Sequence, residues 1–404
     1  MMVGERTDNF QGRLHAWLQA NGRRRDTDSQ AWWTSEGSDL TTAQSFQRSL
    51  YEAGFAGISW PREYGGQGLT LAEEKIFNQE IEGFDLPVAD LEVGLGICGP
   101  TLLSWGSEQQ KRRHLAPMLK GEEIWCQLFS EPDAGSDIAS VRSLARRTEG
   151  GWELSGQKVW TSVAHKAHFG LLLARTDPGL PKHKGLTVFI LNMQTPGVSV
   201  RPLRQMTGDA EFNEVFFDAV SLPADSVVGD VNQGWKVVAT ILMHERTSLG
   251  IGAGVRTMSV VPWNALVELA RELGLASDPS VRESLATLYI QERSVQLLGA
   301  KITQQIPLGA DPGFMGSLVK LADGERIRNA AKLATELVGT AAVTWDPAEP
   351  FQARWARAIS MAPAFSIGGG TDEVQMNIIA ERLLGLPREP RPDTQVAFDQ
   401  GSPG

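Results

Sequence analysis

Two short segments that follow one another along the chain hold the residues with the clearest chemical potential. Residues 125–137 read Trp-Cys-Gln-Leu-Phe-Ser-Glu-Pro-Asp-Ala-Gly-Ser-Asp, an apolar run that ends in a polar turn. Residues 156–162, Gly-Gln-Lys-Val-Trp-Thr-Ser, form a second run that ends in an aromatic ring and two hydroxyls. Such a turn exposes backbone N–H groups and hydroxyls, the partners that a polar heterocycle or a diphosphate needs. Either segment alone is more typical of an ordinary hairpin, so only their combination points to a binding site.

A third segment of interest is glycine-rich. Residues 367–371 read Ile-Gly-Gly-Gly-Thr and precede a helical pattern that opens with Asp372 and Glu373. Backbone N–H groups at the start of a helix attract anions, so this loop is a candidate anion cradle. A flexible turn between two helices explains the same residues equally well.

One carboxylate lies in line with apolar residues. On a helix, Glu245 shares a face with the residues at −7, −4, +4 and +7, which are Val238, Ile241, Leu249 and Gly252. A carboxylate in such a stripe is expected to be desolvated, and desolvation raises its pKa toward the value that a general base needs. The alternative is a Glu245–Arg246 pair on a helix surface, which is far commoner in proteins generally.

The composition describes an ordinary globular protein. The chain has 404 residues, of which 42% are hydrophobic and 21% charged, so two or three domains with a substantial core are expected. The net charge is −10 and no Lys/Arg-rich run occurs, which argues against a nucleic-acid partner or an anionic membrane surface. No stretch approaches transmembrane length and no secretory segment opens the chain, so we expect no membrane insertion and a cytoplasmic location.

Cysteine and histidine usage gives no sign of a metal site. The two cysteines, Cys98 and Cys126, provide neither a disulfide framework nor a ligand cluster. His165, His168 and His183 lack carboxylate or cysteine partners at ligand spacing. We therefore expect no bound metal.

The elements that must position these residues fall into three blocks. Residues 1–122 show helical spacing, 123–229 read as strands between Gly/Pro turns, and 230–389 return to long helical patterns. Residues 390–404 are polar and Pro-rich, and we expect them to form a loose tail. The fold class is therefore mostly α with a central β domain.

Turn-forming residues predict where the helices are interrupted. In the first block these clusters are residues 60–68 and 94–100; in the last they are 277–280, 307–316 and 345–350.

The order and the amino-acid sequences of these segments resemble those of the acyl-CoA dehydrogenase family over nearly the whole chain. Residues 125–137 and 156–162 are similar to its flavin-binding turn and strand end, and residues 58–69 to a Pro-x-x-Tyr-Gly-Gly-x-Gly turn of its first domain. Residues 378–388 are similar to its last helix. The resemblance implies an α domain, a β-barrel-like domain and a C-terminal four-helix bundle, with FAD as the cofactor.

The resemblance also implies roles for single residues. Phe129 and Ser130 would offer an amide and a hydroxyl to the flavin's pyrimidine edge, where donors stabilise the charge that the flavin gains. Trp160, Thr161 and Ser162 would flank the isoalloxazine ring. Ser136 would lie between the cofactor phosphates and the substrate, whereas Thr371 and Glu373 would meet the adenosine diphosphate.

The chain departs from the family in its catalytic loop. Where many members have Tyr-Glu-Gly-Thr, this chain has Gly368 and Gly369 in place of Tyr and Glu. The family's second arrangement places the base in a Glu-Arg pair on the first C-terminal helix, which points to Glu245 as the base and to Arg246 as a partner of the CoA moiety. Losing a ring and a carboxylate at Gly368 and Gly369 enlarges the acyl cavity, which suits a branched or polycyclic acyl group, as in actinobacterial steroid side-chain enzymes.

A second departure concerns the subunit contacts. The family's Arg-x-x-Phe-Gly segment, which reaches a partner's FAD, is missing, and Glu336 stands where a Gln is usual. An acid repels a diphosphate, so the FAD occupancy of each chain and the choice between homo- and hetero-oligomer stay open.

The resemblance implies oxidation of an acyl-CoA to its trans-2-enoyl-CoA, with electrons passed to an electron-transfer flavoprotein. Two alternatives remain: a non-catalytic or half-site partner in a hetero-oligomer, and a flavin monooxygenase or oxidase on the same fold. The acyl group itself is not specified by the sequence.

Overall fold

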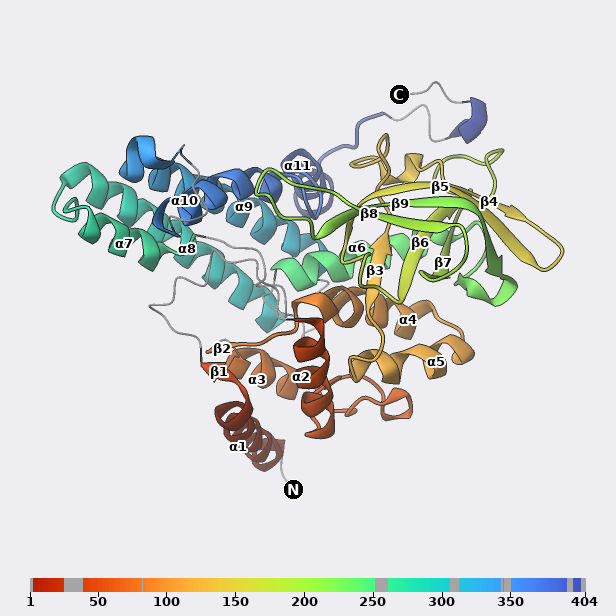
Figure 1. Ribbon diagram of the computed structural model, residues 1–404, viewed down its shortest axis with the longest axis horizontal. Coiled ribbons are helices and arrows are strands. Elements are labelled where there is room, and N and C mark those ends of the chain that lie inside the picture. The colour runs from red at the N-terminus through yellow and green to blue at the C-terminus, as the bar shows by residue number, and fades with distance from the viewer. Residues whose placement is uncertain are drawn as a thin grey trace.

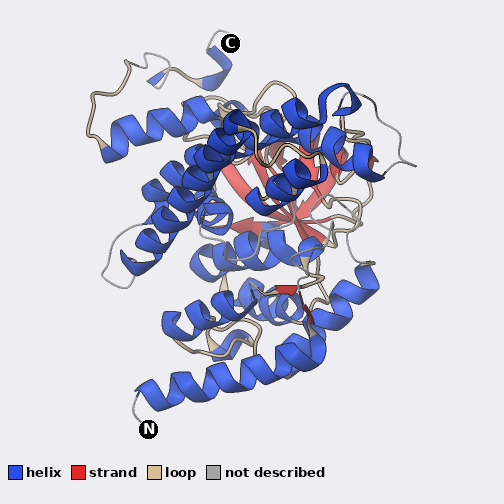
Figure 2. Ribbon diagram, turned by 90° about the vertical axis from the view of Figure 1, so that its left-hand side faces the viewer, coloured by secondary structure: helices blue, strands red, loops and turns tan. Residues whose placement is uncertain are grey.

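The computed structural model describes residues 3–24, 39–81, 83–250, 261–305, 312–342, 344, 350–390 and 395–400. The chain is organised as N-terminal helices, a central sheet and C-terminal helices, in that order (Figure 1). In Figure 2, the C-terminal helices lie in front of the strands and the N-terminal helices lie below them. The fold class expected from the sequence, mostly α with a central β domain, is confirmed.

Five α-helices and one short two-stranded ladder make up most of the N-terminal part, within the residues that the structure describes. The helices are α1 (Val3–Asn21), α2 (Leu40–Glu52), α3 (Leu71–Ile81), α4 (Gly99–Trp105) and α5 (Glu108–Leu119), and the ladder pairs β1 (Arg23–Arg24) with β2 (Phe84–Asp85). The start of α5 is fixed by a capping box, in which Ser107 and Gln110 satisfy each other's main-chain N–H groups. This helix leads directly into the first strand of the sheet.

The predicted turn at residues 94–100 is wrong. The chain there forms one turn of π-helix (Gly94–Cys98) that runs into α4. Its glycines serve close packing, because a Cβ atom on Gly99 would lie 2.1 Å from the ring of Trp60. Glycine therefore marks a helix contact here, and not a chain reversal.

The central sheet has eight strands in the order β10-β7-β6-β4-β5-β9-β8, with β3 paired in parallel to β6. The strands are β3 (Trp125–Leu128), β4 (Leu144–Arg147), β5 (Gly151–Ser162), β6 (Phe169–Arg175), β7 (Leu186–Asn192), β8 (Val198–Pro202), β9 (Phe212–Pro223) and β10 (Val227–Val228). In β6, Leu171 and Leu173 face one core cluster while Leu172 and Ala174 face another. Because both faces are covered, the strand is apolar from Phe169 to Ala174.

The C-terminal part is helical. Its helices are α6 (Gly234–Gly250), α7 (Trp263–Glu272), α8 (Pro279–Gln305), α9 (Pro312–Val338), α10 (Pro350–Met361) and α11 (Asp372–Ile378), the last continued by a π-turn (Ile379–Leu383). The break predicted over 307–316 extends too far, because α9 begins at Pro312, where proline is well tolerated. The break predicted at 345–350 falls mainly outside the described residues.

One core cluster joins the parts of the molecule that position the site. It combines residues of α4, α5 and β3 with Val237, Val238 and Ile241 of α6, all three of which are fully buried. The helix that carries Glu245 is therefore packed against the N-terminal helices and the sheet together.

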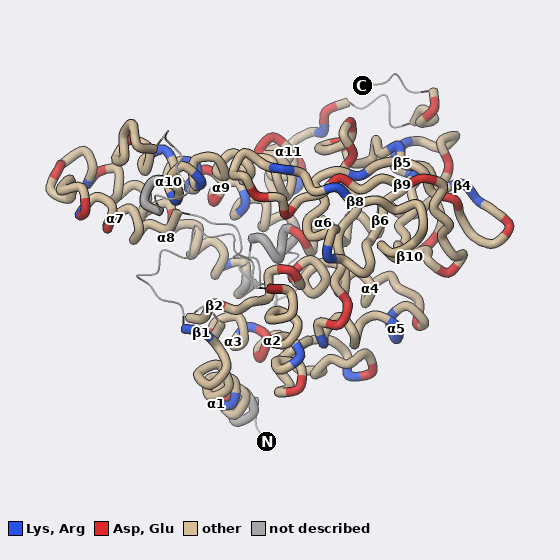
Figure 3. The backbone as a smooth tube through the Cα atoms, in the orientation of Figure 1, with Lys and Arg blue, Asp and Glu red and all other residues tan. Residues whose placement is uncertain are grey.

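The expectation of a loose tail is wrong for residues 395–400, which pack against the loop between β6 and β7. No helix in the described part of the chain combines the length and the apolar character needed to cross a bilayer. Lys and Arg are interspersed with Asp and Glu along the described backbone, as Figure 3 shows.

Candidate active site

The two sequence segments meet at the end of β3. The main-chain N–H of Val159 donates to the carbonyl of Ser130 over 2.9 Å, and the Lys158 ammonium donates to the carbonyl of Phe129, also over 2.9 Å. Phe129 is buried, whereas Ser130 is half-buried. The structure thus brings together the first two predicted flavin residues and the strand that carries Trp160.

A buried ion pair fixes this junction. Lys158 Nζ lies 2.8 Å from Glu131 Oε1, and the Arg142 and Ser143 N–H groups donate to the same carboxylate over 2.6 and 2.9 Å. Burial lowers the pKa of Lys158 to about 8, against the opposing effect of Glu131. Burial alone would raise the pKa of Glu131, but the charge and hydrogen bonds of Lys158 hold it below its usual value. The pair is therefore charged at neutral pH.

Sequence reasoning assigned no role to Lys158 or Glu131, although a signal existed. Lys158 has the same parity along β5 as Trp152 and Leu154, both of which face the core. A lysine at a core-facing position needs a buried acidic partner, and Glu131 is the acid of the neighbouring motif.

Trp160 is presented to solvent by a backbone irregularity. The register between β5 and β9 shifts between Lys158 and Thr161, and Trp160 adopts a left-handed φ of 59°. Its ring is 56% exposed and contacts only the edge of Phe212 among the described aromatic rings, with centroids 5.9 Å apart. Bulges often re-aim a side chain next to an active site, and this one offers an open aromatic face to a flat ligand.

The residues after Trp160 lie deeper. Thr161 is 1% exposed, and its Oγ1 finds no hydrogen-bond partner within the described part of the chain. Its carbonyl accepts from Asn213 Nδ2 over 3.0 Å. Ser162 is half-buried, and Ser136, on the turn after Ser130, is exposed.

Glu245 lies beside the same strand. It is half-buried on α6, and Gln127 Nε2 of β3 lies 3.4 Å from Glu245 Oε2. The expected apolar line holds for Val238 and Ile241, which are fully buried; Leu249 keeps its helical backbone, but its side chain, like Gly252 and the Arg246 side chain, lies outside the described residues. Because Gln127 is two residues before Phe129, the candidate base lies beside the strand that leads into the flavin motif.

The glycine loop is anchored from behind. Gln375 Nε2 donates to the carbonyls of Gly369 and Gly370 over 2.8 and 3.3 Å, and both glycines have left-handed φ values of 69° and 90°. Thr371 caps α11 by accepting from the Val374 N–H over 3.3 Å. Gly368 is exposed.

Two ion pairs tie the loop to α9. Asp372 lies 3.2 Å from Lys320 Nζ and 2.8 Å from Arg328 Nη1. The next residue, Glu373, is exposed. No described contact joins Thr371 or Glu373 to Ser130 or Trp160, so the structure leaves these two parts of the predicted site on separate elements.

Glu336 projects from α9. Its side chain is 58% exposed and lies 3.8 Å from Lys332 one turn earlier. An exposed ion pair of this spacing contributes little to stability, so this acid is available at the surface.

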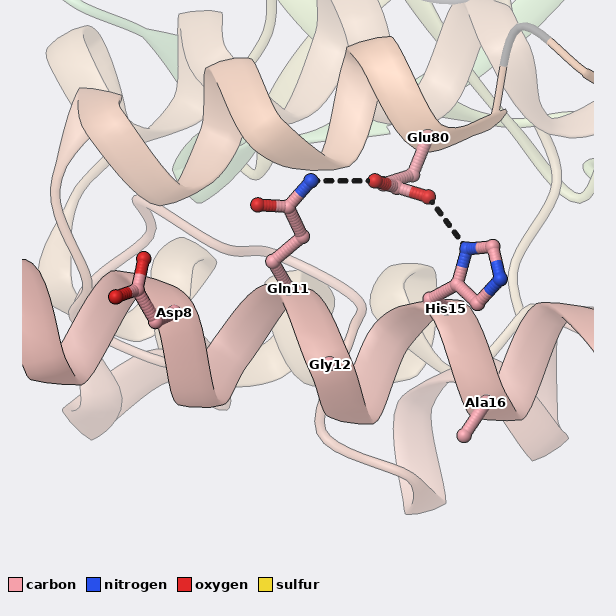
Figure 4. A pocket seen from close by; sticks show the side chains of 6 residues that line it. All are labelled: Asp8, Gln11, Gly12, His15, Ala16 and Glu80. Carbon is pink, nitrogen blue, oxygen red and sulfur yellow. Dashed lines mark hydrogen bonds and ion pairs between the residues drawn. The ribbon is translucent and has the colours of Figure 1, made fainter.

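A shallow groove elsewhere in the molecule is not part of this site. It lies between α1 and α3 and is lined by Asp8, Gln11, Gly12, His15, Ala16 and Glu80 (Figure 4). Gln11 and His15 contact the Glu80 carboxylate at 2.7 and 3.0 Å and lower its pKa. None of the motif residues lines the groove. Among the described residues, no group of three His, Cys, Asp or Glu side chains could hold a metal.

The residues around Trp160 fit a flavin. An open indole face suits a flat heterocycle, and the buried Thr161 hydroxyl lacks a partner that a polar ligand could supply. Half-buried Ser130 and Ser162 add two further hydroxyls. These observations concern this chain's own side chains and agree with the cofactor that the sequence resemblance implies.

Comparison with known proteins supports the same reading. The families described as acyl-CoA dehydrogenase N-terminal, middle and C-terminal domains match residues 24–122, 126–220 and 232–384. Acyl-CoA dehydrogenase FadE34 of Mycobacterium tuberculosis is 41% identical over 85% of this chain, which spans only 46% of that relative. Acyl-CoA dehydrogenase IpdE1 of the same organism is 39% identical, with 86% of this chain and 88% of the relative covered.

Solved structures give the same result. The Tcur3481-Tcur3483 steroid ACAD superimposes with a TM-score of 0.75 at 29% identity, covering 96% of this chain and 98% of that one. The ChsE4-ChsE5 complex from Mycobacterium tuberculosis gives a TM-score of 0.74 at 26% identity, covering 95% and 98%. The chain therefore belongs to the acyl-CoA dehydrogenase family and is an oxidoreductase of that class with FAD as its cofactor.

Proposed function

We propose that this chain oxidises a bulky acyl-CoA thioester to its trans-2-enoyl-CoA, with Glu245 as the base. The observation that carries the proposal is the contact between Glu245 and Gln127, which places a half-buried carboxylate beside the strand that leads into Phe129 and Ser130. A general base must lie within reach of the proton that it removes, and partial burial adjusts its basicity.

In the reaction, the Glu245 carboxylate takes the proton from the α-carbon of the thioester. Gln127 donates to Glu245 Oε2, which orients the carboxylate toward the proton that it removes. Bound FAD would supply the acceptor for the hydride of the β-carbon, and the electron pair of the broken α-C–H bond would form the new double bond. Arg246, the next residue, is proposed to bind the CoA moiety.

The cofactor is proposed to be held mainly by the middle domain. The Phe129 amide and the Ser130 hydroxyl serve the pyrimidine edge, and Trp160, Thr161 and Ser162 flank the ring. Preorganised donors at that edge stabilise developing negative charge. Ser136 is assigned to the region between the phosphates and the thioester, and Thr371 and Glu373 to the adenosine diphosphate.

The acyl group is proposed to be branched or polycyclic. Gly368 and Gly369 present no side chain where related enzymes carry larger residues, and Gly368 has only the carbonyl of Ala364 near the position of a Cβ atom, at 3.4 Å. One of the structural relatives is named a steroid ACAD. Together these features favour a steroid side-chain thioester over a thin straight chain.

The assembly is proposed to be an oligomer, and a mixed one is favoured. The structural relatives are named as two-component proteins. On α8, Ile290 and Leu297 are 64% and 57% exposed and lie seven residues apart, hence on one face of the helix. The exposed acid Glu336 also favours a second candidate function, a half-site partner that shares one FAD with an unlike chain.

Flavin content and anaerobic bleaching test the proposal. The full-length chain is purified alone and with co-expressed candidate partner chains, and a steroid side-chain CoA thioester is added without oxygen. We expect a yellow protein that bleaches, and reduced flavin that an electron-transfer flavoprotein reoxidises. A colourless chain with every partner, or bleaching only with straight-chain thioesters, contradicts the proposal.

Substitution isolates the base. Glu245→Gln should retain the flavin and slow bleaching on the order of 10³-fold, the usual scale for losing a general base. Glu325→Gln, at an exposed acid on α9, is the matched control and should bleach like the wild type. Bleaching by Glu245→Gln at the wild-type rate would reject the assignment.

A further inference from the structure

Residues 395–400, called the C-terminal strap below, dock on the loop 177–185 between β6 and β7. Figure 1 shows the strap in dark blue beside the strands, away from α11. Three main-chain contacts hold it: Ala397 forms a β-bridge with Pro181, the Phe398 N–H donates to the Leu180 carbonyl over 3.0 Å, and the Asp399 N–H donates to the Pro178 carbonyl over 3.1 Å. The strap is therefore held in place by directional main-chain hydrogen bonds to the loop.

Its one aromatic side chain covers a buried cation. The Arg175 guanidinium carbon lies 3.8 Å from the centroid of the Phe398 ring, and Arg175 is 1% exposed. Burial lowers the pKa of Arg175 to about 10. A guanidinium taken out of water is costly unless its donors are satisfied and its face is covered, and Phe398 supplies that cover.

The donors of Arg175 hold the chain that follows Ser136. Its nitrogens donate to the Ala139 carbonyl over 2.6 Å, to the Val141 carbonyl over 3.3 Å and to the Lys182 carbonyl over 3.0 Å. A shift of the guanidinium therefore changes two carbonyls within five residues of Ser136.

The docking loop holds the same turn from its other end. Lys182 Nζ lies 2.8 Å from Asp137 Oδ2, directly beside Ser136. The next residue of the loop, His183, packs its ring edge-on against Trp235 of α6, with centroids 4.6 Å apart. One loop thus contacts the strap, the Ser136 turn and the helix of Glu245.

We propose that Phe398 is a positioning residue for the dehydrogenation, acting through Arg175 to keep the Ser136 turn in the shape that binds the diphosphate and the thioester. The inference rests on the role proposed for Ser136. No described contact joins the ring to the flavin motifs or to Glu245, so we expect its effect on binding and not on the proton-transfer step. The strap makes the end of the chain part of the site.

Three variants of the full-length chain, purified in the same assembly as the wild type, test this. Phe398→Ala removes the ring, Phe398→Tyr keeps an aromatic face, and Val396→Ala is the control, because Val396 is an exposed apolar residue of the same strap. Amide hydrogen exchange over residues 137–143 and the kinetics with acyl-CoA are measured for each. Exchange does not depend on activity.

Phe398→Ala should raise the exchange rates over 137–143 and the KM for acyl-CoA about tenfold, the scale of one buried cation–π contact, while kcat stays within about twofold. Phe398→Tyr should restore both, and Val396→Ala should match the wild type.

Exchange confined to the strap and loop 177–185, or an unchanged KM in an active Phe398→Ala enzyme, would overturn the proposal. If the wild type shows no turnover, the proposed function fails instead, and exchange over 137–143 alone decides the strap.

Discussion

The flavin side and the acyl side of the proposed site are built differently. On the middle-domain side, Phe129 and Ser130 are held by Lys158 and Val159 through hydrogen bonds of 2.9 Å, with a buried ion pair behind them. On the C-terminal side, the glycine loop is exposed at Gly368 and is held by the Ala364 carbonyl at one end and by Gln375 at the other. The difference indicates a rigid holder for a constant cofactor and an open wall for a variable acyl group.

The rigidity of the flavin side has a thermodynamic cost. Removing Lys158 and Glu131 from water costs free energy. A buried ion pair offsets this desolvation cost only when its hydrogen bonds are complete. Here the carboxylate accepts two main-chain N–H bonds and the ammonium reaches a main-chain carbonyl. The pair therefore serves to place the motif turn, in addition to any net stability.

The largest effect is expected from breaking that pair. Lys158→Met leaves the Glu131 carboxylate buried without its cation and should cost about 3–5 kcal/mol of unfolding free energy and abolish flavin binding. Urea unfolding and visible absorbance measure the two effects. Lys184→Met, at an exposed lysine of the loop 177–185, is the control. A stable, yellow Lys158→Met protein would show that the flavin side is not rigid in the way described.

The Lys158–Glu131 pair also makes the free energy of unfolding depend on pH. Because the pKa of Glu131 in the folded protein lies below its ordinary value of 4.5, the stabilisation by its charge is complete above pH 4.5 and disappears as the pH falls through the lower, folded value. The pKa of Lys158, which burial lowers from 10.5 to about 8, lies well above this pH range, so Lys158 stays charged throughout it. The destabilisation by Glu131→Gln should therefore be large at pH 7 and shrink below pH 4.5, measured by urea midpoints. The exposed control Glu149→Gln should show no such trend; a gap between Glu131→Gln and wild type that stays constant with pH would contradict it.

Much of the fold was predictable because its signals are local. The apolar run at residues 186–192, bounded by turn-forming residues, is typical of a strand and corresponds to β7, and the helical stripe around Glu245 corresponds to α6. The prediction of a turn at 94–100 was wrong because glycine is needed at position 99 for close packing against the ring of Trp60, which is distant in sequence. A single sequence does not reveal which purpose a glycine serves.

The site was predictable in part for the same reason. Ser130 and Trp160 lie in contiguous motifs, whereas the link from Gln127 to Glu245 spans 118 residues and depends on how α6 packs on β3. The cover of Arg175 by Phe398 joins residues still farther apart, in a segment whose composition indicated a loose tail. Contacts between distant segments arise from tertiary packing, which the spacing of residues does not encode.

A smaller effect is expected from adding a side chain to the glycine loop on the proposed acyl side. Gly368→Ala adds a methyl group whose only near neighbour is the Ala364 carbonyl at 3.4 Å, so stability should change by less than about 1 kcal/mol. If Gly368 lines the acyl cavity, kcat/KM for a steroid side-chain thioester should fall about tenfold, while a straight-chain thioester is unaffected. Gly83→Ala, where a Cβ atom meets nothing within 4 Å, is the control. An equal loss for both thioesters would place the glycine outside the cavity.

The smallest stability change is expected at Trp160, where the effect on stability and the effect on flavin binding separate most clearly. Its ring is 56% exposed and its φ is 59°, so Trp160→Gly loses little burial and relieves a strained backbone. Trp160→Ala keeps the strain and should be less stable than Trp160→Gly by about 1 kcal/mol. Both variants lose the aromatic wall and should weaken flavin binding about tenfold, as expected for one stacking contact. Thermal unfolding without flavin and flavin titration separate the two effects. If Trp160→Gly bound flavin as tightly as the wild type, the bulge would be a feature of the fold alone, since its exposed ring would then serve no ligand.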